Sequence, residues 1–218
     1  MPTVKLHAVS IGQGEAIVVL HGLFGSARNW QTFSRALAND YRVITVDLRN
    51  HGLSPHADTM TYAEMSADVF ELLDKQQIDR AIILGHSMGG KTAMQMAFDH
   101  PRRIQQLIVV DIAPVPYAHD YDELLNALSA LPLEQVNRRA DANELLKLNV
   151  VDNELRLFLL QNLVFKKAQQ PYWRINIPAL KTGISHLLRY EFPQSASFTG
   201  QTDFIRGILS DYIIDAYR

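Results

Sequence analysis

The sequence predicts an α/β domain built on a mostly parallel central sheet. Short runs of β-branched and other apolar residues recur along the first half of the chain, and amphipathic stretches separate them. Runs that are apolar on both faces are typical of strands buried in a parallel sheet. Strands that alternate with helices indicate an α/β architecture. The chain has 218 residues, 47% hydrophobic and 20% charged, which suits one domain with a sizeable core.

The expected parallel strands are residues 16–20, 42–46, 81–85 and 107–111, because each run carries apolar residues on both faces. Residues 3–9 read as a further strand, which Gly-Gln-Gly joins to the first of these runs. We expect this strand to be an antiparallel addition to the sheet.

Three amphipathic stretches lie between the strands and are predicted as helices. They cover residues 29–40, 61–77 and 89–101, and Pro101 closes the last of them.

The alternation stops after Asp111. Residues 120–188 show helical patterns with little strand signal, which predicts a helical cap inserted over the sheet. We place this cap at 116–194, so that 1–115 and 195–218 form the core; a packed helical subdomain without a covering role is the alternative. Near the end of the chain, 203–209 resembles one more strand and 211–218 begins a helix.

Composition excludes several classes of function. A net charge of −2 gives no basic surface for nucleic acid or an anionic membrane. The absence of cysteine excludes disulfides and thiolate metal sites. No apolar run reaches membrane-spanning length, and Met1–Leu20 lacks a signal-peptide pattern, so we expect a cytoplasmic protein. No H-E-x-x-H metal motif occurs, and we expect no metal and no cofactor.

One turn satisfies two catalytic patterns at once. Residues 85–89 read G-x-S-x-G, the nucleophile elbow of serine hydrolases. Residues 85–92 read G-x-x-x-x-G-K-T, a phosphate-binding P-loop, in which Lys91 and Thr92 would be the functional residues.

The surrounding sequence favours the serine. A P-loop normally follows the first strand of its domain, whereas several strands and helices precede this turn. Acyl transfer also needs a second oxyanion-hole amide from the loop after an earlier strand, and His21-Gly22 follows the strand at 16–20. Gly85 and Gly89 supply the small residues that a crowded strand-to-helix turn requires. A P-loop nucleotide hydrolase and a purely structural glycine turn stay as remote alternatives.

Five ordered motifs carry a resemblance to a known family. They are HGLFGSARNW (21–30), VDLRNHGLSP (46–55), GHSMGGKTAM (85–94), VVDIAPV (109–115) and WRINIP (173–178). Together they resemble the small bacterial esterases of the YbfF group in the α/β-hydrolase superfamily, and their mitochondrial abhydrolase relatives. The resemblance implies the α/β-hydrolase fold and cleavage of short to medium acyl esters, or of acyl-CoA thioesters, through an acyl-enzyme.

The resemblance also implies the roles of individual residues. Ser87 would be the nucleophile, and the backbone N–H groups of Leu23 and Met88 would hold the oxyanion. Asp111 would be the acid that orients the general base, with Asp211 as the alternative. Ser210 is either an auxiliary residue near the site or a simple turn residue. The segment with Asp47, Arg49 and His51 is expected to tie down a loop.

The general base has no evident candidate among the eight histidines. In these hydrolases the histidine follows the last strand, whereas this chain ends at Arg218 in what we expect to be the helix before that strand. His21 and His86 are expected to shape turns, and His119 and His186 are poor substitutes. We therefore expect the last strand, the histidine and the closing helix to be missing, and this chain to be impaired.

Two function classes stay open at this point. The first is a serine esterase or thioesterase that acts on a small-molecule acyl substrate, of which this chain would be a truncated form. The second is a natural short homologue that binds acyl ligands or partners without turnover. Apolar residues that are candidates for the acyl pocket are Phe24, Phe158, Leu159, Leu163 and Trp173, most of which serve equally well as core residues.

Overall fold

The computed structural model describes residues 2–214 and confirms the α/β architecture. Within this part of the chain, the central sheet has six strands in the order β1-β3-β2-β4-β5-β8, parallel except for β1. The strands are β1 (Ala8–Ile11), β2 (Glu15–Leu20), β3 (Tyr41–Val46), β4 (Ala81–His86), β5 (Ile104–Val110) and β8 (Gln201–Ile205).

Strand β1 is antiparallel, as predicted, but its neighbour and its start differ from the prediction. β1 pairs with β3, whereas β2, the next strand in sequence, lies between β3 and β4 and is parallel to both. Both edges of β2 are therefore paired with other strands, and β1 pairs with the free edge of β3 instead. The strand begins at residue 8 because the segment before it is held by side chains: the Val4 amide donates to Asp68, and the His7 amide donates to the Ser54 hydroxyl.

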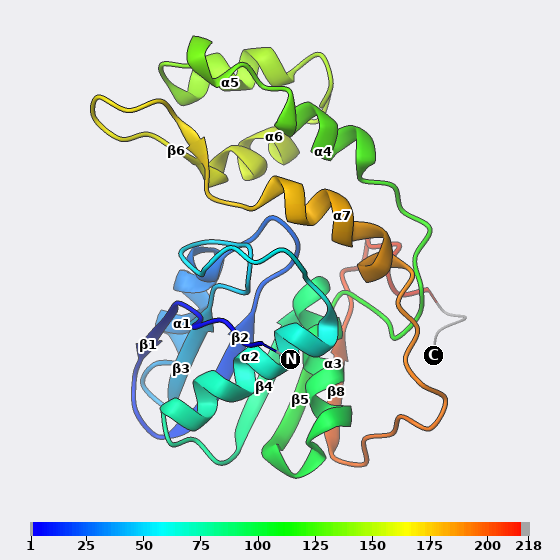
Figure 1. Cartoon of the computed structure of the whole chain (residues 1–218). Helices are drawn as coiled ribbons and strands as arrows, with labels where there is room; N and C mark the ends of the chain where they lie inside the picture. The colour runs from blue at the N-terminus through cyan, green and yellow to red at the C-terminus, as the bar shows by residue number, and fades with distance from the viewer. Residues whose placement is uncertain (1, 215–218) are drawn as a thin grey trace.

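The three predicted helices form and cover both faces of the sheet. Helix α1 (Gln31–Leu37) packs on one face, whereas α2 (Tyr62–Lys75) and α3 (Met88–Asp99) pack together on the other (Figure 1). Alternate residues of β2 separate the two cores: Val18 and Leu20 face α2 and α3, and Ile17 and Val19 face α1.

The helices between β5 and β8 lie beyond the carboxyl ends of the parallel strands, and the connection after α7 returns along the sheet to the start of β8 (Figure 1). These helices are α4 (Asp122–Ser129), α5 (Arg139–Leu146), α6 (Asn153–Leu159) and α7 (Ile177–Leu188). A two-stranded antiparallel ribbon of β6 (Leu163–Val164) and β7 (Tyr172–Trp173) was not predicted. The cap limits at 116 and 194 stay predictions. Short 3-10 turns are η1 (Ala27–Trp30), η2 (Pro101–Arg103), η3 (Leu133–Gln135) and η4 (Leu160–Asn162).

The end of the described chain differs from the prediction. Strand β8 covers 201–205 instead of 203–209, because Ile208 and Leu209 lie in a turn and are 93% and 95% exposed. No helix forms over 211–214, and the rest of the predicted helix, 215–218, lies outside the described residues. Across residues 2–214, no helix combines the length and apolar character that crossing a membrane requires.

Candidate active site

Ser87 occupies a strained turn between β4 and α3. Its φ of 52° and ψ of −117° lie where non-glycine residues are rare. The backbone is fixed on both sides, since Ser87 N donates to Val110 O at 3.0 Å and Lys91 N donates to Ser87 O at 3.1 Å. The Ser87 hydroxyl forms no hydrogen bond with any described residue and is partly exposed.

The glycines of this turn are required by close backbone contacts. A Cβ on Gly85 would lie 2.1 Å from Gly89 O, and a Cβ on Gly89 would lie 2.4 Å from Leu20 O. Neither neighbour can move, because both are backbone atoms. The close approach of β4, α3 and β2 at this point therefore depends on the two glycines that the motif contains.

The loop after β2 lies directly against this turn. A Cβ on Gly22 would lie 2.9 Å from His86 Nδ1 and 3.3 Å from Ser87 Cβ. Leu23 and Met88 both line the cavity at Ser87. Leu23 and Met88 thus reach the Ser87 cavity from two different elements.

Two buried histidines shape the neighbouring loops. His21 Nδ1 donates to Gly22 O at 2.8 Å, and its Nε2 accepts from Leu48 N at 3.0 Å. His51 Nε2 accepts from Phe24 N at 3.2 Å, and its Nδ1 donates to Arg49 O at 3.0 Å. An amide donor on Nε2 requires the neutral ring. Burial lowers the pKa of His21 to about 4 and that of His51 to about 3.

The other candidate histidines do not contact the Ser87 hydroxyl. His86 is partly exposed beside Trp30, with ring centroids 6.4 Å apart; burial lowers its pKa and the Asp111 carboxylate opposes that shift. His119 stacks on Tyr117 at 5.7 Å. His119 and His186 are exposed and do not line the Ser87 cavity.

Asp111 follows β5 at the same edge of the sheet as Ser87. In the β4–β5 ladder His86 pairs with Val110, so Ser87 and Asp111 are the next residues on adjacent strands. Asp111 has φ 57° and its amide donates to Ile205 O at 2.8 Å. Its Oδ1 accepts from Gly207 N at 3.2 Å.

The turn after β8 meets Asp111 and contains Ser210. Ser210 N donates to Gly207 O at 3.1 Å, which places Ser210 in the turn that contacts the Asp111 carboxylate. Asp211, the alternative acid, is exposed.

A small cavity of about 40 Å³ opens at Ser87. It is mainly apolar and receives several tyrosines; its lining residues are Leu23, Tyr62, Ser87, Met88, Lys91, Ile112, Tyr117, Tyr121, Ile184, Leu187, Leu188 and Tyr212. A cleft of about 530 Å³ shares Tyr117, Tyr121, Ile184 and Leu188 with this cavity and provides a wider space beside it.

The structure does not bring the predicted pocket residues into this cavity. Phe24 is buried against Tyr121, with centroids 6.1 Å apart. Phe158 packs against the core, and Trp173 Nε1 donates to Leu128 O at 3.0 Å. Leu159 and Leu163 are fully buried. The lining comes instead from the loop after β2, from α2, α3 and α7, and from the crossover after β5.

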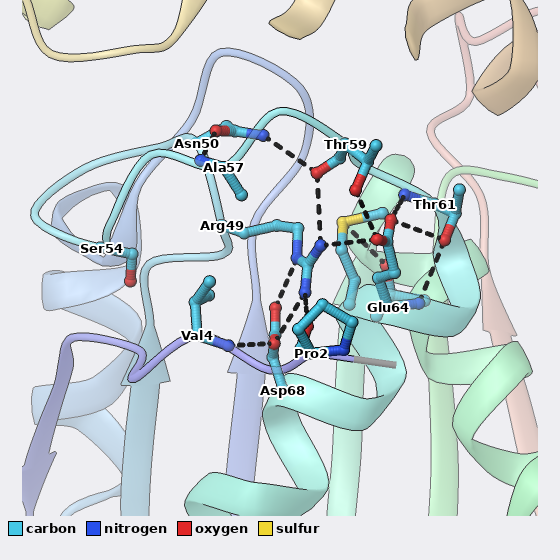
Figure 2. A network of polar contacts seen from close by, with 12 residues as sticks. Pro2, Val4, Arg49, Asn50, Ser54, Ala57, Thr59, Thr61, Glu64 and Asp68 are labelled. Atoms are coloured by element: carbon cyan, nitrogen blue, oxygen red, sulfur yellow. Dashed lines mark hydrogen bonds and ion pairs between the residues drawn. The ribbon is translucent and has the colours of Figure 1, made fainter.

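A polar network supports the loop that follows β3, as the sequence predicted (Figure 2). Arg49, only 1% exposed, forms a two-bond contact with Asp68, through Nε at 2.7 Å and an Nη atom at 2.9 Å. Its other Nη lies 3.1 Å from Glu64 Oε1. The Asp47 carboxylate accepts from Ala27 N at 2.7 Å and from Leu53 N at 2.8 Å.

Lys91 and Thr92 are buried in helix α3, which contradicts the P-loop alternative. Thr92 is fully buried, and its hydroxyl donates to Met88 O at 3.0 Å. Lys91 Nζ donates to Val115 O at 2.7 Å. Within the described residues, no group of three or more histidine and acidic side chains is arranged to hold a metal ion.

Comparison with known proteins places the chain in a family. Residues 15–203 match the profile of the α/β hydrolase fold. The chain belongs to the α/β-hydrolase family. It is similar to esterase YbfF of Escherichia coli strain K12, with 37% identity over 203 residues that cover 93% of this chain and 77% of that protein.

Two further relatives extend the comparison. The chain is 39% identical to the sn-1-specific diacylglycerol lipase ABHD11 of Xenopus laevis over 92% of its own length, and it spans 66% of that lipase. The solved structure of a marine microorganism esterase has a TM-score of 0.94 and 34% identity, covering 99% of this chain and 85% of that one.

Proposed function

We propose that this chain carries the nucleophile, the acid and the oxyanion hole of a serine esterase that acts on short to medium acyl esters. The observation that carries the proposal is the Ser87 turn: a strained serine at the N-terminus of α3 and beside the loop after β2, whose hydroxyl forms no hydrogen bond with a described residue. The names of the relatives, esterase and lipase, support an ester substrate.

The proposed reaction begins with attack of Ser87 Oγ on the ester carbonyl. The C–O bond to the leaving group breaks as the Ser87–acyl bond forms, and the hydroxyl proton passes through a general base to the departing alcohol. The backbone N–H groups of Leu23 and Met88 stabilise the oxyanion, aided by the dipole of α3. Water then releases the acid and regenerates Ser87.

Asp111 acts as the orienting acid in this proposal, and Ser210 assists from the turn that contacts it. We assign the general base to none of the described histidines. His21 and His51 use both ring nitrogens in backbone hydrogen bonds, and no described histidine bonds to the Ser87 hydroxyl. For the 218-residue chain we therefore expect little hydrolysis unless a base is supplied.

Chemical rescue tests the proposal. Hydrolysis of p-nitrophenyl butyrate is measured with and without imidazole, and Ser87 is probed with a fluorophosphonate followed by mass spectrometry. We expect imidazole to raise the rate in the natural chain and not in Ser87→Ala. The exposed Ser129→Ala, at the end of α4, serves as the matched control and should behave as the natural chain does. Rapid Ser87-dependent hydrolysis without imidazole would reveal an internal base, and hydrolysis indifferent to Ser87→Ala would refute the nucleophile.

A homologue that binds acyl ligands without turnover is the second candidate. It is favoured by one observation, the absence of a described histidine at the Ser87 hydroxyl. Ligand binding together with a Ser87 that resists both the fluorophosphonate and imidazole rescue would support this candidate over the esterase.

A further inference from the structure

Lys91 is a buried cation beside the proposed nucleophile. It lies one helical turn after Ser87 in α3, it is only 2% exposed, and it lines the same cavity. The esterase chemistry proposed above makes no use of this charge.

No carboxylate neutralises Lys91 within the described chain, where no ion pair to its Nζ forms within 4.0 Å. The ammonium donates to Val115 O and lies over the Tyr117 ring at 5.0 Å and the Tyr62 ring at 5.9 Å. These contacts solvate a cation only in part, because an ammonium has three donors and one carbonyl accepts one of them.

Burial lowers the pKa of Lys91 to about 8, so the side chain is still largely charged at neutral pH. A buried charge is costly unless it is paired and hydrogen-bonded. The rings of Tyr62 and Tyr117 both line the cavity, which places the ammonium among its walls. An anion that entered the cavity would supply the missing counter-charge.

We propose that the Ser87 cavity selects acyl groups that end in a carboxylate, which pairs with Lys91: the half-esters of short dicarboxylic acids. The inference rests on the proposed function and names its substrate class. The small cavity volume, about 40 Å³, favours a short acyl chain. The ester carbonyl lies at Ser87, the carboxylate lies at Lys91, and the alcohol portion extends toward the wider cleft lined by Tyr121 and Leu188.

The test is a binding comparison that needs no turnover. Monomethyl glutarate, a monoanion, and dimethyl glutarate, its neutral counterpart, are titrated into the natural chain and into Ser87→Ala, and Kd is measured by amide NMR shifts. We expect the monoanion to bind at least about tenfold more tightly, a difference of about 1.4 kcal/mol. Equal affinities of the two esters, or failure of the monoanion to bind, would by themselves overturn the proposal.

Lys91→Gln in the Ser87→Ala background separates charge from hydrogen bonding. Glutamine keeps an N–H donor for Val115 O and removes the charge. We therefore expect the preference for the monoanion to disappear, so that the two Kd values become about equal. An unchanged preference would show that Lys91 only anchors the crossover after β5. Lys181→Gln, an exposed lysine on α7, is the matched control and should keep the preference. The fluorophosphonate labelling of Ser87 is a separate measurement, so the proposed nucleophile and the proposed selectivity can be refuted independently.

Discussion

The Ser87 turn and the loop at residues 47–61 lie at the same end of the sheet and use polar residues in opposite ways. In the loop, Asp47, Arg49 and His51 direct their side chains into hydrogen bonds with backbone or with α2. In the turn, the Ser87 backbone is held tightly while its hydroxyl has no partner among the described residues. The loop thus uses its polar groups for stability, whereas the turn leaves one hydroxyl without a hydrogen bond to a described residue, as the proposed nucleophile requires.

The two regions are also connected. His51 accepts from Phe24 N, and Asn162, in the turn that follows α6, donates to Phe24 O at 2.8 Å. Phe24 has φ 61° and follows Leu23, whose amide is proposed for the oxyanion hole. The hydrogen bonds of the loop therefore fix the backbone beside the amide that is proposed for the oxyanion hole.

Among the changes that test this comparison, Asp68→Asn is expected to have the largest effect on the free energy of unfolding. The change leaves Arg49 buried with Glu64 as its remaining carboxylate partner, and we expect the free energy of unfolding to fall by about 3 kcal/mol. Urea denaturation measures the loss. Asp74→Asn on the same helix is the control, because its pair with Arg103 is exposed and should be worth less than about 0.5 kcal/mol. Equal effects of the two changes would show that the buried network is not what stabilises the loop.

The second effect concerns pH. The pKa values of His21 and His51 lie below the ordinary value of 6.5, at about 4 and about 3, because burial disfavours their charged forms. Below pH 6.5 the unfolded chain binds protons that the folded chain does not, so stability is lost as pH falls toward these values. The loss is about 1.4 kcal/mol for each pH unit and each histidine.

Unfolding measured between pH 7 and pH 4.5 tests this prediction. His51→Gln should reduce the slope of stability against pH by up to one proton, even if it lowers stability at pH 7. His186→Gln, an exposed histidine on α7, should leave the slope unchanged. A slope that does not change in His51→Gln would mean that this ring is protonated in the folded protein.

The sequence is informative where chemistry is local. Apolar runs predicted β2, β3, β4 and β5, and the crowded glycines at Gly85 and Gly89 predicted the Ser87 turn, because each depends on a few adjacent residues. The partner of β1 was not predictable in this way, because it depends on which strand edge is still unpaired once β2, β3 and β4 are assembled.

Side chains that meet through tertiary packing were the least predictable. Phe158 and Trp173 are apolar and lie between β5 and β8, yet they pack against the core, and Tyr117 and Tyr121 line the Ser87 cavity instead. The burial of Lys91 was equally hidden, since a lysine in a helix is usually exposed.

The smallest effect is expected at Ser87 itself, and its sign is opposite to that in the loop. Ser87→Gly removes a side chain from a backbone conformation with φ 52°, where a Cβ is strained. Because the hydroxyl has no hydrogen bond with a described residue, nothing in this part of the chain offsets that relief, and we expect the free energy of unfolding to rise by about 1 kcal/mol. Ser87→Ala keeps the Cβ and should stay within about 0.5 kcal/mol of the natural chain. A marked loss of stability in both variants would show that Ser87 is a structural residue, and the contrast between turn and loop would disappear.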